Sequence, residues 1–139
     1  MKRLFIVMLG VLFTGSAMSA DWVVIKTDSD NNTYSVDTSR ITKVPTRLST
    51  TGVVISSWIK MDFSKKVNGA SYVLAEEYTK CKEYKVATNT LVSYSSDGKV
   101  VNSAYNVSGS SVDFARYEPV LPGTVGEDLY RSVCALAPY

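Results

Sequence analysis

The chain of 139 residues contains no histidine. It therefore lacks the commonest general base and metal ligand, and a nucleophilic serine or cysteine would have no imidazole to activate it. Its eight glycines are scattered and form no phosphate-binding motif. Glu76 and Glu77 are adjacent carboxylates, but neighbours in a strand point to opposite faces and cannot act as an acid–base pair. These absences argue against an enzyme, and we expect no cofactor and no metal site.

Long apolar runs are also scarce. The run over residues 4–13 is too short to span a bilayer as a helix. Basic residues precede it and small residues follow it, so we interpret residues 1–20 as a cleaved signal peptide, with a transmembrane anchor as the alternative. No cysteine directly follows this segment, which argues against a lipoprotein. We expect a periplasmic or secreted protein without a membrane span, made of one domain at residues 21–139.

The exported part has no excess of either charge. The chain holds 15 Lys and Arg against 13 Asp and Glu, and Lys2 and Arg3 leave with the signal. This balance argues against a nucleic-acid partner. Residues 40–85 are nevertheless basic, with nine Lys and Arg against four Asp and Glu. They predict either a surface for acidic partners or ordinary solvated lysines that discourage the pairing of strand edges. The candidate contact residues are Lys60, Lys65, Lys66, Lys80, Lys82 and Lys85.

Strand-forming residues are abundant, with turn-forming residues between them. Residues 53–63 alternate apolar and polar side chains, which is typical of a strand with one buried face. The Asp97-Gly98 pair between two alternating runs predicts a hairpin. We expect strands at residues 22–26, 33–37, 53–63, 71–81, 91–95, 99–107 and 112–117, with a continuation of the fourth to Val86 through a bulge.

Three tyrosines, Tyr72, Tyr78 and Tyr84, share one parity in this pattern with Leu74 and Val86. A shared parity places side chains on one face of a strand. We interpret this stripe either as part of a core that mixes tyrosine with aliphatic side chains or as a partly exposed face for protein binding, since tyrosine is enriched in interfaces.

One segment predicts a helix, and it lies near the end of the chain. Thr124 and Glu127 match a capping box, and apolar residues recur at helical spacing until Pro138. The helix must dock its apolar face, and the sheet is the simplest partner, giving a mainly β fold of the α+β class. Cys134 lies in this helix, and the other cysteine of the chain is Cys81. Two cysteines in an exported protein most often form one disulfide, with free or intermolecular thiols as the alternative.

Five motifs follow one another in a specific order. They are Trp22, Tyr34-x-Val-Asp37, Trp58-Ile-Lys60, Glu77-Tyr-Thr-Lys-Cys81 and Pro122-Gly-Thr-x-Gly-Glu-x-Leu-Tyr-x-x-x-Cys134. In this order they resemble the surface-adhesin protein E family of Gram-negative bacteria, over nearly all of residues 21–139. The last motif is the most specific part of the resemblance.

The resemblance implies an antiparallel sheet of about six strands with the C-terminal helix tied to one face by a Cys81–Cys134 disulfide. It also implies binding to host extracellular-matrix proteins and a capacity to form homodimers. The adhesin that names the family is lipid-anchored, whereas this chain lacks the cysteine for an anchor. We therefore hold two hypotheses: an exported, adhesin-like module that binds a protein or an acidic polysaccharide, and a soluble periplasmic accessory protein, either an inhibitor or an envelope-assembly partner.

Overall fold

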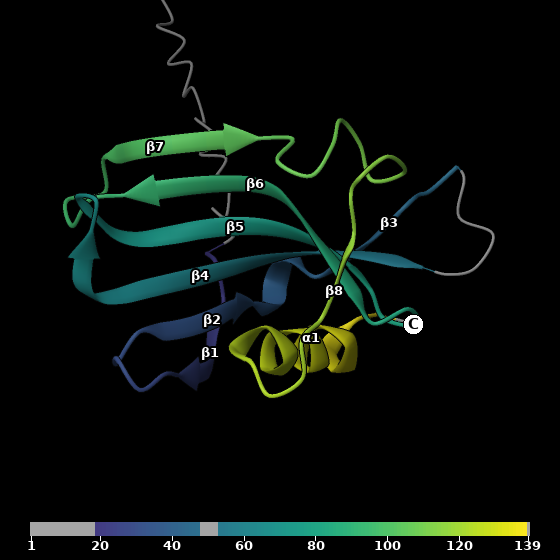
Figure 1. Cartoon of the computed structure of the whole chain (residues 1–139), viewed down its shortest axis with the longest axis horizontal. Helices are drawn as coiled ribbons and strands as arrows, with labels where there is room; N and C mark the ends of the chain where they lie inside the picture. The colour runs from purple at the N-terminus through teal and green to yellow at the C-terminus, as the bar shows by residue number, and fades with distance from the viewer. Residues whose placement is uncertain (1–18, 48–52, 139) are drawn as a thin grey trace, which may run out of the picture.

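The computed structural model describes residues 19–47 and 53–138 (Figure 1). The expected signal peptide, residues 1–20, lies outside these described residues except for its last two positions. Ten elements follow in the chain: β1 Trp22–Thr27, β2 Thr33–Asp37, the short 3-10 helix η1 Thr38–Arg40, β3 Thr42–Val44, β4 Val54–Val67, β5 Ala70–Lys80, β6 Lys85–Tyr94, β7 Val100–Tyr105, β8 Glu118–Pro119 and α1 Val125–Leu136.

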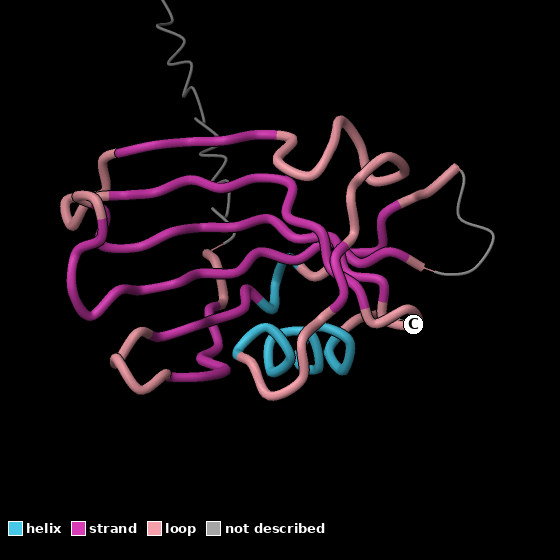
Figure 2. The backbone as a smooth tube through the Cα atoms, viewed as in Figure 1, coloured by secondary structure: helices cyan, strands magenta, loops and turns pink. Residues whose placement is uncertain are grey.

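The strands form one antiparallel sheet, and its main path runs β1-β2-β4-β5-β6-β7. The two shortest strands lie off this path, with β3 paired to β4 and β8 paired to β6. The expected sheet of about six strands with a C-terminal helix is confirmed, and the two short strands are additions to it (Figure 2).

The turns follow from the residues that occupy them. Between β1 and β2, the Asp28 carboxylate accepts hydrogen bonds from the backbone N–H groups of Asp30 and Asn32, both at 2.9 Å, while Asn31 adopts a φ of 61°. Aspartate and asparagine form such turns because their side chains bond the local backbone and tolerate left-handed geometry. The predicted hairpin is also present: Gly98 takes a φ of 80° between β6 and β7.

Two strand predictions are wrong. The chain does not continue from Cys81 to Val86, because it reverses after β5 through a turn in which Tyr84 has a φ of 57°. Residues 112–117 form no strand either: the segment curls on itself, and the Tyr117 hydroxyl donates to the Val112 carbonyl at 3.0 Å. In both places the side chains alternate as they do in a strand, but the backbone turns.

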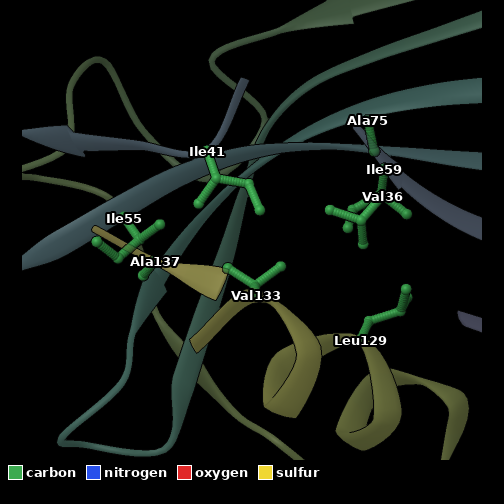
Figure 3. Packing of buried hydrophobic residues seen from close by; sticks show 8 residues of the cluster. All are labelled: Val36, Ile41, Ile55, Ile59, Ala75, Leu129, Val133 and Ala137. Atoms are coloured by element: carbon green, nitrogen blue, oxygen red, sulfur yellow. The ribbon is translucent and has the colours of Figure 1, made fainter. Parts of the chain in front are cut away.

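The core lies between α1 and one face of the sheet. In Figure 3, Leu129 and Val133 of α1 point toward side chains of the sheet. Burying each of these two side chains contributes about 1.5–3 kcal/mol. The buried cluster consists of Val36, Ile41, Ile55, Ile59, Ala75, Leu129, Val133 and Ala137. We call the face that carries this cluster the helix face and the opposite side of the sheet the outer face.

The start of α1 is fixed by side chains, as predicted, but with one different partner. The Thr124 hydroxyl accepts from the Glu127 N–H at 3.3 Å. The Glu127 carboxylate accepts from the N–H of Gly123 at 2.7 Å, one residue before the N-cap. It also accepts from the Tyr84 hydroxyl at 2.5 Å and from the Arg131 guanidinium at 2.7 Å. Glu127 thus joins the helix start to the β5–β6 turn.

Candidate functional site

The six candidate lysines do not form one patch. Lys65 and Lys66 lie at the end of β4, whereas Lys80, Lys82 and Lys85 lie at or beside the β5–β6 turn. Strand β5, with 11 residues, separates these two ends. At about 3.4 Å per residue, the separation is roughly 35 Å. The β4–β5 hairpin therefore divides the basic segment between opposite ends of the sheet.

Much of the positive charge at the β5–β6 turn is matched locally. The Lys80 and Lys85 ammonium groups lie 3.6 and 3.8 Å from the Glu83 carboxylate. The Lys80 Nζ atom also lies 4.2 Å from the centre of the Tyr117 ring. Burial and then nearby Tyr78, Asp113 and Glu83 raise the pKa of Tyr117 to about 12, so this phenol stays neutral. This turn therefore offers less free charge than the sequence suggests.

The sixth lysine, Lys60, lies on the outer face in the middle of β4. Its Nζ atom is 2.8 Å from the Asp62 carboxylate and 5.0 Å from the centre of the Tyr72 ring. Tyr72 stacks on Tyr94 of the neighbouring strand, with ring centres 4.9 Å apart and planes 10° from parallel. We call Lys60, Asp62, Tyr72 and Tyr94 the Tyr72 cluster. All four side chains are partly exposed, so the cluster presents rings, a cation and an anion to solvent.

The predicted tyrosine stripe is only partly correct. Tyr72 and Tyr78 share the outer face with Leu74, as their parity predicted. Tyr84 does not, because the turn directs its ring against Tyr130 of α1, with ring centres 4.6 Å apart. Even-numbered residues lie on the outer face in β5, but after the turn, at the start of β6, they lie on the helix face. Val86 is therefore on the helix face. The outer face therefore lacks Tyr84, which the pattern placed there, and it includes Tyr94 of β6.

A second polar group on the outer face surrounds Glu76. Its carboxylate accepts hydrogen bonds from Asn89 Nδ2 at 2.7 Å, from Ser56 Oγ at 3.2 Å and from Thr90 Oγ1 at 3.3 Å. Trp58 lies directly across the strand pair from Glu76 and is partly exposed. Three donors hold the Glu76 carboxylate in one orientation. It therefore presents a hydrogen-bond acceptor and a negative charge beside the Trp58 ring. The outer face thus combines aromatic rings with fixed charges of both signs.

A model of the family described as surface-adhesin protein E matches residues 22–135, from the first residue of β1 to the penultimate residue of α1. The chain belongs to the surface-adhesin protein E family. Comparisons with curated proteins and with solved structures give no significant match.

The family match includes both cysteines, and the structure joins them. Cys81 lies in the turn directly after β5, and Cys134 lies in α1, with their Cα atoms 5.7 Å apart and a disulfide between them. The expected disulfide is confirmed and ties the helix to the sheet region. The Tyr130 hydroxyl adds a second link, since it donates to the Cys81 carbonyl.

Within residues 19–47 and 53–138, no helix is long and apolar enough to cross a membrane. In the same described ranges, no group of three or more His, Cys, Asp or Glu side chains is placed to hold a metal ion.

Sequence reasoning missed the partners that make the Tyr72 cluster. Tyr94 joins the cluster because the register of β6 against β5 places it directly across from Tyr72. Asp62 joins it because it lies two residues from Lys60 on the same strand face. A spacing of two residues along a strand predicts pairs such as Lys60 and Asp62, because it places both side chains on the same face.

Proposed function

We propose that the protein is an exported, non-enzymatic binding module that engages a macromolecular partner through the outer face of its sheet. Membership of an adhesin family supports this function. The observation that carries the proposal is the Tyr72 cluster, where a stacked tyrosine pair and a lysine lie together on a partly exposed strand surface.

The chemistry of this face suits a protein or an acidic polysaccharide, including those of a host extracellular matrix. Tyrosine and tryptophan supply large contact areas at little cost in side-chain entropy. Lys60 is held between Asp62 and the Tyr72 ring, so its position is set before a partner arrives. Lys65 and Lys66 are exposed at one end of the sheet and provide the attraction that brings an acidic partner closer.

The test measures binding of the exported chain to immobilised laminin, vitronectin and heparin by surface plasmon resonance at several salt concentrations. We expect binding that weakens with salt, and a loss of about tenfold or more in affinity for Tyr72→Ser, as for a central aromatic contact. The double change Lys65→Glu/Lys66→Glu should mainly slow association.

Lys99→Gln is the matched control, because Lys99 is 83% exposed and belongs to the β6–β7 turn outside the basic segment. It should leave binding unchanged. No binding to any of the three at micromolar concentration, or binding that ignores both Tyr72 and salt, would refute the proposal.

A second function has support from the cysteines. Both cysteines of the chain are joined to each other, so neither thiol is available for a lipid anchor. This favours a soluble periplasmic accessory protein, an inhibitor or an envelope-assembly partner, as the alternative to a surface adhesin. Cell fractionation separates the two: release by osmotic shock together with protection from external protease supports the periplasmic function, and cleavage on intact cells supports surface display.

A further inference from the structure

A cavity of about 350 Å³ lies between the start of α1, strand β8 and the ends of β5 and β6. Its volume falls in the range of small-molecule sites. Leu121 and Pro119 at its wall are exposed, so the cavity reaches the molecular surface. It is lined by Glu77, Val86, Pro119, Val120, Leu121, Thr124, Gly126 and Leu129.

One carboxylate lies in these largely apolar walls, that of Glu77. Among the residues that the structure describes, no donor bonds this carboxylate and no cation pairs with it. Burial alone raises its pKa. Glu76, its neighbour in the chain, is bonded by three side chains on the outer face. The Glu77 side chain is partly buried in the cavity wall and keeps some access to solvent. A partly buried carboxylate without a partner is costly, so such a group is uncommon unless a ligand or a reaction uses it.

The charged side chains of α1 are already matched elsewhere. On α1, Glu127 pairs with Arg131 at 2.7 Å, and Asp128 pairs with Lys26 of β1 at 3.0 Å. Among the described residues that line the cavity, Glu77 is the only one with an ionisable side chain. The positive charge that would match Glu77 is therefore missing from the described walls of the cavity.

A second unpaired polar atom lies beside it. Ser57 of β4 is directly across the strand pair from Glu77, and its hydroxyl is fully buried without a hydrogen-bond partner in the described structure. Side chains directly opposite each other in an antiparallel pair are close neighbours. Two neighbouring side chains on the helix face thus have unused bonding capacity: Glu77 in the cavity wall, and Ser57 beside it but outside the lining residues.

We propose that this cavity binds a small organic cation, an ammonium group carried on an apolar body, with Glu77 as its counter-ion. The ammonium supplies the missing charge, and the aliphatic walls formed by Val86, Val120 and Leu129 take the apolar body. This site lies on the helix face and is separate from the outer face, so it adds a second specificity to the molecule and does not depend on the partner proposed above.

The probes are n-hexylamine and n-hexanol, which share an apolar chain and differ in charge. Binding to the disulfide-intact protein is followed by ¹H–¹⁵N NMR. We expect hexylamine to shift the amide signals of Val86, Val120 and Leu129 and to bind about tenfold or more tightly than hexanol, as one charge-assisted contact in a partly buried site provides. A third probe, N-acetyl-lysine methylamide, mimics the lysine side chain of a peptide. If it binds more tightly than hexylamine, the natural ligand is a lysine side chain of a polypeptide. If hexylamine binds more tightly, the natural ligand is a free amine.

Two variants test the assignment. Glu77→Gln keeps the shape of the side chain and should abolish the preference for the amine while hexanol binding persists. Gly126→Leu fills the cavity from within α1, where a Cβ atom at Gly126 meets only Thr124 Oγ1, at 3.4 Å, and it should weaken both probes. Equal affinity of the two probes for the wild-type protein, unchanged amine binding by Glu77→Gln, or signal shifts confined to other regions would overturn the proposal. Glu77→Gln should leave binding through the outer face intact, so the two proposals fail separately.

Discussion

Replacing one cysteine tests how far the helix depends on its covalent link. The Cys81–Cys134 bond closes a loop across a sequence separation of 53 residues. The chain-entropy model assigns a loop of this length about 4 kcal/mol of unfolding free energy. A domain of this size has a total stability of roughly 5–15 kcal/mol, so the link is a large part of the whole. Helix α1 has 12 residues, a length that is marginal without tertiary contacts.

The variants are Cys81→Ser, Cys134→Ser and the double replacement, each compared with the oxidised wild type by circular dichroism during heating. A loss of about 4 kcal/mol corresponds to a fall in Tm of roughly 12–20 °C for a domain of this size. All three variants should fall by similar amounts, because either single change breaks the same bond. Ala135→Ser is the control: it places a serine at an exposed position of the same helix and should cost only about 0.5 kcal/mol.

Two outcomes would refute the reasoning. A fall in Tm below about 4 °C would mean that the core contacts and the Tyr130 hydrogen bond hold the helix without the bond, since this corresponds to only about 1 kcal/mol. A double variant much less stable than either single variant would mean that the cysteines act separately. Reduction of the wild type should reproduce the double variant, which separates loss of the bond from effects of serine.

Three further predictions concern the helix. Val133→Ala removes methyl groups from a side chain that is 1% exposed, and it should lower the unfolding free energy by about 2 kcal/mol in urea titrations. Thr124→Ala removes the N-cap and should cost about 1 kcal/mol, whereas Thr124→Ser should restore most of it. Hydrogen bonds from Tyr84, Gly123 and Arg131 lower the pKa of Glu127 to about 2 from its ordinary 4.5, so its stabilising effect is present above the ordinary value and is lost as pH falls toward 2. The urea midpoint of the wild type should therefore drop more between pH 5 and pH 2.5 than that of Glu127→Gln, and equal drops would contradict this.

The sequence predicted those parts of the fold that depend on local chemistry. Thr124, Glu127 and the apolar spacing after them define α1, and the Asp97-Gly98 pair defines the hairpin that follows β6. It did not predict the turn at Tyr84, because a tyrosine with positive φ has no local signature and is held there by its contacts with Tyr130 and Glu127. Tertiary contacts on a distant helix decide this turn, and single-sequence patterns do not carry them.

The candidate site was predicted in composition but not in arrangement. The basic segment exists as a sequence feature, yet a hairpin folds it so that Lys65 and Lys82 lie at opposite ends of the sheet. Charge clusters along the chain become surface patches only when the register brings them together. By contrast, the Tyr72 cluster arises across strands, from residues that are 12 and 22 positions apart in the chain, and only the pairing of β4, β5 and β6 makes it visible.

For the adjacent carboxylates Glu76 and Glu77, the sequence pattern predicts the direction of each side chain but not its surroundings. The period of a strand required Glu76 and Glu77 to point to opposite faces, and they do. That rule does not distinguish the two residues, but their surroundings differ. On the outer face, Glu76 accepts hydrogen bonds from Ser56, Asn89 and Thr90. On the helix face, Glu77 lies in a wall of mainly aliphatic side chains. The asymmetry comes from α1, which packs on the helix face and contributes to the cavity beside Glu77. Because one helix docks on one side of the sheet, the two neighbouring glutamates have different surroundings. Glu76 is a hydrogen-bonded acceptor on the outer face, whereas Glu77 is an unpaired carboxylate that favours a cation from outside the chain.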